Sequence, residues 1–142
     1  MFFCVRNERV GKLPERKSAE VGYWPRVVGI PLIAQMEALG WAYRITGETK
    51  YADKAIELLL AVSEHAPATH PRMREGLFGA RGHIAYGLAL GIFLCRDRIS
   101  PEQMARIERC AETYISDYLA GVQVLWLHNY RGLYGGPAAM LA

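Results

Sequence analysis

The stretch Ile84–Cys95, IAYGLALGIFLC, runs for three helical turns' worth of sequence without a single charged residue. Its apolar residues follow neither the alternation of a half-buried strand nor the one-sided spacing of a surface helix. A helix that is apolar all round must be covered by other elements on most of its sides. We therefore predict a buried helix over Ala80–Cys95, and the flanking sequence must supply the elements that cover it.

Two helices are expected before this buried one. The first is predicted over Val28–Ile45, with Pro25 and Pro31 marking its entry. Gly47 follows it, because glycine readily adopts the conformation needed just past a helix end. The second is predicted over Lys50–His65, with Thr49 as its cap. We expect the second helix to cover the core with one face, because apolar residues recur there at helical spacing. They are Tyr51, Ala55, Leu58, Leu59 and Val62.

A fourth helix follows, with the strongest terminal signal in the chain. Ser100 can cap it, Pro101 occupies the first helical position, and Gln103 can complete a capping box. Its end is expected near Gly121, and a fifth helix is expected to begin within residues 132–137. Apolar residues again line one face of the fourth helix: Met104, Ile107, Ala111, Tyr114, Ile115 and Tyr118.

Charge-poor helices thus alternate with amphipathic ones, which is typical of αα-hairpins with one helix inside and its partner outside. Gly40 and Gly91 each follow a leucine at comparable places, 51 residues apart. This period is longer than the roughly 34 residues of a tetratricopeptide repeat. We predict an all-α fold, an incomplete α/α toroid of hairpins with inner and outer helices. Residues 1–24 would form a lead-in segment and residues 25–142 the partial toroid domain.

The composition restricts the classes of function. The 142 residues suffice for one domain, and the net charge of +3 comes from scattered basic residues, which argues against nucleic-acid binding. No apolar run reaches the roughly 18 residues of a membrane span, and no signal peptide is recognised. Cys4, Cys95 and Cys110 lack metal-ligand spacing, and the last two lie among apolar neighbours, so we expect buried thiols. Neither a metal nor a cofactor is expected.

Four stretches support comparison with a known family. They are GWAYRITGETKYADKAIELLLA (40–61), RGHIAYGLALGIFL (81–94), ISPEQMARIERCAETYISDYLAG (99–121) and LWLHNYRGLYGGPAAMLA (125–142). Through them, over about residues 24–142, the chain resembles the helical domain of heparinase II/III-like polysaccharide lyases and related α/α-toroid carbohydrate enzymes. The second and fourth stretches are the more specific, because they place polar residues at the starts of inner helices.

The resemblance implies cleavage of a uronate-containing polysaccharide by β-elimination. A base removes the C5 proton, and hydrogen bonds to the sugar carboxylate stabilise the charge that develops. By position, Asn129 would bind that carboxylate, and His128 would help to neutralise it or act as the base. Tyr130 or Tyr134 would face the sugar. The order here is His-Asn, whereas the best-known members have Asn-His, and the pair could instead cap the fifth helix.

Further residues would bind substrate if the resemblance holds. Arg81 and His83 open the buried helix at the end that would line the cleft, although His83 can equally be a core histidine. Arg131 could hold a sugar carboxylate or a helix end. Trp126 could stack on a sugar ring, whereas Trp41, inside a helix, is expected to pack in the core.

Two other classes of function stay open. A glycoside hydrolase of the α/α-toroid type needs a pair of carboxylates, and Glu75 is the only acid near the expected helix starts. A helical-repeat interaction module would instead present a groove without clustered polar groups. The lyase resemblance implies a polysaccharide or oligosaccharide as the partner, and a periplasmic or secreted location.

The sequence stops within the expected fifth helix, so we expect a missing C-terminal part of the same chain. An open ring would leave apolar residues uncovered, among them Ile92, Phe93, Met140 and Leu141. Exposed apolar surface of this kind drives association. We therefore expect residues 1–142 alone to be marginally stable, to associate and to lack lyase activity.

Overall fold

The structure, a computed structural model, describes residues 23–70 and 78–121, with side chains over 28–70 and 81–116. Within these ranges the chain forms four α-helices and one short 3-10 helix, and it contains no strand. The elements are α2 (Tyr23–Thr46), α3 (Thr49–His65), α5 (Phe78–Cys95), η2 (Arg96–Arg98) and α6 (Pro101–Gly121). The all-α prediction is confirmed for this part of the chain.

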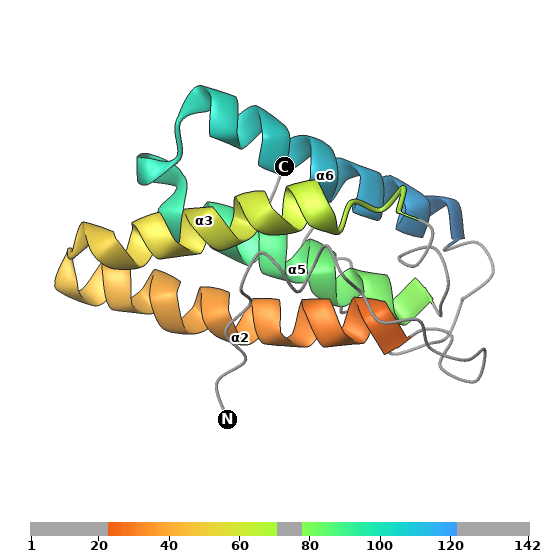
Figure 1. Cartoon of the computed structure of the whole chain (residues 1–142), viewed down its shortest axis with the longest axis horizontal. Coiled ribbons are helices and arrows are strands. Elements are labelled where there is room, and N and C mark those ends of the chain that lie inside the picture. The colour runs from red at the N-terminus through yellow and green to blue at the C-terminus, as the bar shows by residue number, and fades with distance from the viewer. Residues whose placement is uncertain (1–22, 71–77, 122–142) are drawn as a thin grey trace.

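The four α-helices form two αα-hairpins that lie side by side (Figure 1). α2 turns back into α3, and α5 turns back through η2 into α6, so the two members of each hairpin are antiparallel. α2 and α5 consequently run in one direction, while α3 and α6 run in the other. α5 contacts α2, α3 and α6, which makes it the central helix of the described structure.

Glycines bring the backbones of α2 and α5 into close approach at four heights. A Cβ atom added at any of them would clash with the facing side chain, so a residue without a side chain is needed at each contact. In each contact the two facing residues are 54 or 55 positions apart in the sequence, and later residues of α2 face later residues of α5. α2 and α5 are therefore parallel neighbours. The pairs are Gly29 with His83, Leu32 with Gly87, Met36 with Gly91, and Gly40 with Leu94.

This register differs slightly from the expected 51-residue repeat. That spacing equates Gly40 with Gly91, but Gly40 faces Leu94, almost one helical turn farther along α5. Gly91 instead accommodates Met36, which lies one turn before Gly40 on α2. The two glycines therefore act at different heights of one interface, and the facing register exceeds the expected period by about one turn.

α5 is buried on almost all sides, as its apolar sequence predicts. Ile84, Leu88 and Leu94 are each no more than 1% exposed, whereas Phe93 is 55% exposed. We expected Ile92 to be uncovered as well, and this is wrong, because Ile92 is 3% exposed within the core cluster. Successive residues point about 100° apart around a helix, so neighbours such as these face different surroundings. Among the helices of the described ranges, none combines the length and apolarity of a membrane span.

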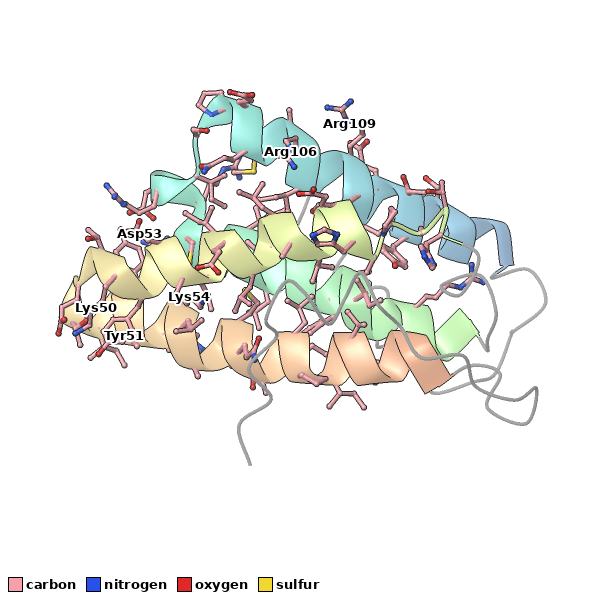
Figure 2. The ribbon with its side chains drawn as sticks, in the orientation of Figure 1. Lys50, Tyr51, Asp53, Lys54, Arg106 and Arg109 are labelled. Atoms are coloured by element: carbon pink, nitrogen blue, oxygen red, sulfur yellow. The ribbon has the colours of Figure 1, made fainter. Side chains whose placement is uncertain are left out.

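α3 and α6 cover the core with one face each and keep their charges outside. Lys50, Asp53 and Lys54 are exposed on α3 (Figure 2). The predicted apolar face of α3 is confirmed, except that Tyr51 is only half-buried. The buried residues of α3 are Ala52, Ala55, Ile56, Leu58, Leu59, Ala61 and Val62. Those of α6, over the part whose side chains are described, are Ile107, Cys110, Ala111 and Tyr114.

Two of the three predicted helix-end signals are confirmed. The Ser100 N–H donates to Gln103 Oε1 at 2.9 Å, and the Gln103 N–H donates to Ser100 Oγ at 3.2 Å, which completes the capping box of α6. Gly47 has φ 72° just past α2, a left-handed conformation that favours glycine. The cap assigned to Thr49 is wrong. Glu48 is the extended cap residue, without a side-chain cap bond, because the turn after Gly47 is so short that Thr49 is already helical.

α2 begins at Tyr23, five residues before the predicted Val28 and two residues inside the expected lead-in segment. Pro31 lies inside α2, more than two turns after its start, rather than near the helix entry as the predicted start at Val28 implies. Proline lacks the N–H that would bond one turn back, and this normally weakens a helix. The long glycine-mediated contact with α5 spans this position on both sides and supports α2 where its own hydrogen bonding is interrupted.

Candidate functional site

Six of the eight predicted site residues lie outside the described ranges. They are His128, Asn129, Tyr130 and Tyr134 of the predicted catalytic group, with Trp126 and Arg131 of the substrate-binding group. Their roles stay predictions. The other two, Arg81 and His83, lie in the first turns of α5.

His83 belongs to the contact between α5 and the first half of α2. The Cβ of His83 lies directly against Gly29 of α2. Arg81 is 8% exposed and is the one charged residue buried among the described side chains, whereas His83 is half-buried. His83 is therefore the more accessible of the two residues at this end of α5.

The prediction that Trp41 packs in the core is wrong, because Trp41 is 52% exposed. Ile30 and Ile45 are also exposed, and all three recur on one side of α2 at spacings of 11 and 4 residues. This side differs from the one that carries Gly29 and Gly40 against α5. α2 is thus apolar on two sides, and only one of them is covered in the described structure.

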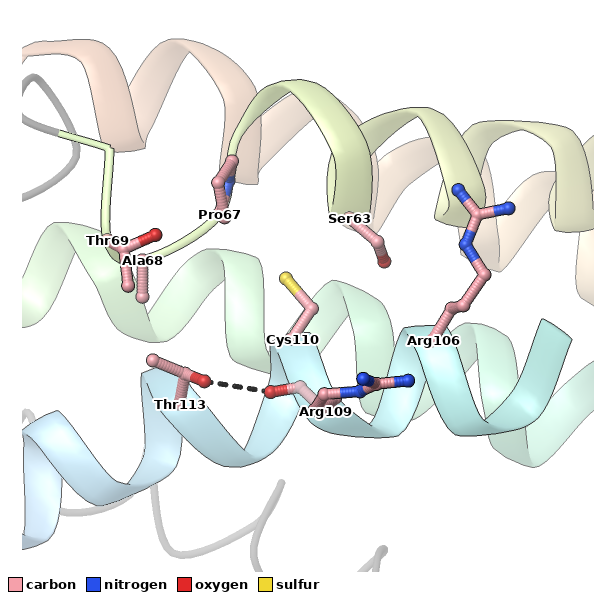
Figure 3. Close-up of a pocket in the computed structure, with 8 residues that line it drawn as sticks. All are labelled: Ser63, Pro67, Ala68, Thr69, Arg106, Arg109, Cys110 and Thr113. Atoms are coloured by element: carbon pink, nitrogen blue, oxygen red, sulfur yellow. Dashed lines mark hydrogen bonds between the residues drawn. The ribbon is translucent and has the colours of Figure 1, made fainter. Parts of the chain in front are cut away.

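A cavity of about 320 Å³ lies between the end of α3 and the middle of α6 (Figure 3). Its size is at the lower end of the roughly 300–1,000 Å³ typical of small-molecule sites. α3, the segment after it and α6 form its walls. Residues that line it include Ser63, Pro67, Ala68, Arg106, Arg109 and Thr113.

The wall after α3 is fixed to α6 by a buried hydrogen bond. α3 ends at His65, and Pro67 follows, as proline commonly does after a helix end. The Tyr114 hydroxyl then donates to the Ala66 carbonyl oxygen at 2.6 Å, with Tyr114 only 1% exposed. This bond holds Pro67 and Ala68 over α6 and so defines the cavity.

Two hydroxyl groups line the cavity from facing helices. The Ser63 hydroxyl donates to the Leu59 carbonyl within α3, and the Thr113 hydroxyl donates to the Arg109 carbonyl within α6, each at 2.8 Å (Figure 3). Because each hydroxyl hydrogen is used within its own helix, the oxygen lone pairs are what these residues offer to a ligand.

Two arginines supply the positive charge of the cavity. Arg106 and Arg109 are three positions apart on α6, and both line the cavity. Arg106 points towards α3, whereas Arg109 extends along its own helix (Figure 3). An Arg106 terminal nitrogen lies 3.7 Å from a Glu64 carboxylate oxygen, and Arg109 Nε donates to the Ala105 carbonyl at 3.4 Å. Both contacts are long. Each guanidinium has five N–H donors, so most of these donors remain for hydrogen bonds to an anionic ligand.

Burial favours the protonated thiol of the cysteine at the cavity. Figure 3 shows the Cys110 sulfur pointing from α6 into the space between the helices. Burial raises the pKa of the Cys110 thiol to about 11, although a hydrogen bond with Ser63 acts in the opposite direction. Cys95 is buried too, and burial raises its pKa. Both predicted buried thiols are confirmed, while Cys4 lies outside the described ranges. The described side chains include no cluster of three or more potential metal ligands.

A second polar cluster lies where α2 ends and η2 begins. The Tyr43 hydroxyl donates to Asp97, and Arg44 forms an ion pair with the same carboxylate at 3.0 Å. The hydrogen bond raises the pKa of Tyr43 and lowers the pKa of Asp97. Solvent screens such exposed pairs, so they stabilise the fold little. They join the ends of α2 and α5, opposite to the end that carries Arg81 and His83, so these groups form no common site.

The sequence contains only a partial signal of the cavity. Arg106, Arg109 and Thr113 recur every three or four positions along α6, beside its buried face. Taken alone, this pattern is indistinguishable from a solvated helix surface. The opposite wall comes from residues more than forty positions earlier, and only the packing of α3 on α6 brings the two together.

No protein-family model matches the chain, and no curated protein and no solved structure matches it either. Any functional proposal therefore rests on the chain's own residues and geometry. They provide the parallel packing of α2 on α5, exposed apolar residues on α2, and a cavity lined by two arginines between α3 and α6.

Proposed function

We propose that the chain forms part of an α/α-toroid domain, with α2 and α5 as inner helices and α3 and α6 as outer helices. The observation that carries this proposal is the parallel packing of α2 on α5. In a ring of antiparallel hairpins, every inner helix runs in the same direction beside its neighbours. α5, which has no charged residue after Arg81, and the exposed apolar residues of α2 also suit inner helices, which need a neighbour on each side.

The proposed activity is that of a polysaccharide lyase acting on a uronate-containing polymer. Because parallel inner helices begin at the same rim, Arg81 and His83 at the start of α5 would lie near the start of the next inner helix. The proposal places His128 and Asn129 at that start, so that polar groups from two inner helices gather at one cleft.

The chemistry assigns a role to each group. Asn129 donates hydrogen bonds to the substrate carboxylate and stabilises the charge that develops when the C5 proton leaves. His128 helps to neutralise the carboxylate or takes the proton, and Tyr130 or Tyr134 passes a proton to the departing oxygen. The C4–O bond breaks as the C4–C5 double bond forms. Arg81, His83, Trp126 and Arg131 bind the sugar.

Removing the Asn129 amide tests this activity. The protein is incubated with uronate polymers, and the unsaturated product is followed by its new absorbance. Asn129→Ala should lower turnover roughly 100-fold or more, because one charge-stabilising donor is lost. Gln123→Ala, a nearby amide without a proposed role, should leave turnover unchanged.

The outcomes separate the classes of enzyme. Normal turnover by Asn129→Ala would remove this residue from the mechanism. Release of reducing ends without any unsaturated product would indicate a glycoside hydrolase, the alternative that requires two carboxylates. The absence of cleavage with every uronate polymer would contradict the proposed lyase activity.

A helical-repeat interaction module is the second candidate, and the exposed side of α2 favours it. Ile30, Trp41 and Ile45 form a stripe of large apolar residues that a protein partner could cover. In a toroid, a further inner helix covers the same stripe. A natural protein that buries Trp41 within its own fold, seen as a blue-shifted fluorescence that Trp41→Phe removes, would favour the toroid.

A further inference from the structure

We propose that the cavity between α3 and α6 binds a small hydroxylated carboxylate, of which a single uronic acid is an example. Arg106 and Arg109 stand at one side of this cavity, and hydroxyl oxygens and apolar surface line the rest. The site lies between the outer helices, and neither Arg81 nor His83 lines it. It is therefore distinct from the proposed lyase cleft.

The positive charges of α6 favour an anion at this place. Both arginines line the cavity, so the positive charge of each attracts an anion that enters it. A guanidinium presents paired N–H donors that match the two oxygens of a carboxylate. Arg106 already attracts the Glu64 carboxylate at 3.7 Å, too long for a hydrogen bond. A ligand carboxylate placed closer would displace this weak contact.

The electrostatic surroundings favour a singly charged ligand over a phosphate dianion. The cavity lies at the C-terminal end of α3, which carries partial negative charge, and Glu64 adds a full charge nearby. Hydrogen bonds partly offset the negative charge at the end of α3. The Val62 carbonyl accepts from the Ala66 N–H, and the Ala66 carbonyl accepts from the Tyr114 hydroxyl. Two arginines facing one carboxylate can hold a monoanion, whereas a dianion meets stronger repulsion.

The remaining lining suits a ligand that carries hydroxyl groups on an apolar frame. Ser63 and Thr113 offer acceptor oxygens because their hydrogens are used within their own helices. Ligand hydroxyls can donate to them. Pro67 and Ala68 present C–H surface on the wall held by Tyr114, against which the carbon face of a sugar ring can pack. Donors, acceptors and apolar surface thus occupy separate parts of one cavity.

Titration of the full chain with glucuronate, glucose and inorganic phosphate tests the proposal. Methyl signals of Ala68 and Thr113 in NMR spectra report on the cavity directly. We expect glucuronate to shift both signals saturably, with glucose and phosphate causing little change. Arg106→Gln combined with Arg109→Gln should weaken glucuronate binding roughly tenfold or more, because charge-assisted hydrogen bonds are lost.

Two single variants serve as controls. Arg96→Gln removes the same charge from an exposed position in η2 and should leave the affinity unchanged. Glu64→Gln should strengthen binding, because it removes the competing carboxylate. An equal response to glucose or to phosphate, no response to glucuronate, or undiminished binding by the double arginine variant would each overturn the proposal. None of these outcomes depends on lyase activity.

Discussion

Among single residues, the glycines between α2 and α5 have the most specific structural role. A Cβ at Gly29 would lie 2.9 Å from the backbone nitrogen of Ile84, and a backbone atom cannot rotate away. A Cβ at Gly91 would instead meet the ends of Met36 and Leu59, which can change rotamer. The same substitution should therefore have different consequences at the two positions.

We predict that Gly29→Ala lowers the free energy of unfolding by roughly 1–3 kcal/mol, the usual cost of overpacking. Gly91→Ala should cost less, because the side chains can move and alanine favours a helix by about 1 kcal/mol over glycine. Urea unfolding followed by circular dichroism measures both. Equal effects of the two variants would show that backbone approach does not distinguish these positions.

At the scale of helices, the sequence predicts what local chemistry determines. The Ser100–Gln103 capping box and Gly47 involve only neighbouring residues, and both predictions are confirmed. For Pro31, in contrast, the local preference does not determine the structure. Its local preference favours the start of a helix, but contacts with α5 on both sides of it extend α2 back to Tyr23. Packing between elements thus overrides a local signal, and sequence patterns alone do not reveal that packing.

The capping box gives a prediction at this scale. Ser100→Ala should reduce the free energy of unfolding by about 0.5–2 kcal/mol, because it removes the acceptor of the Gln103 N–H. Thr49→Ala is the matched control and should change it by less than about 0.5 kcal/mol, because Thr49 does not cap α3. Thermal unfolding of the two variants measures both changes in stability. A larger loss with Thr49→Ala would contradict the observed helix start.

For the whole molecule, alternation of apolar and amphipathic helices predicts hairpins, and the described structure contains two. It does not predict which side of each helix has a neighbour. Both Trp41 on α2 and Ile92 on α5 belong to charge-poor helices, yet Trp41 is exposed and Ile92 is buried. The cavity also depends on which helices are neighbours. Its walls come from α3 and α6 and exist only once those helices pack.

The uncovered side of α2 leads to a prediction about association. Ile45 is 81% exposed next to Trp41, and such apolar surface promotes self-association. We expect the chain of residues 1–142 to associate with rising concentration in sedimentation experiments, and Ile45→Glu to shift it towards monomer. Ala105→Glu places the same charge at an exposed position on α6 and should have little effect. Equal behaviour of both variants would mean that the α2 stripe does not mediate the association.

The central claim is that α2 and α5 are parallel neighbours in the register set by the glycines, since the toroid proposal depends on it. Nuclear Overhauser effects in the Ile45→Glu variant test this most directly. If α2 and α5 are parallel in this register, we expect contacts from Gly40 to the Leu94 methyl groups. The same spectrum should show contacts from Gly87 to the Leu32 methyl groups. Contacts from Gly40 to residues near the start of α5, with none to Leu94, would show antiparallel helices and contradict the account.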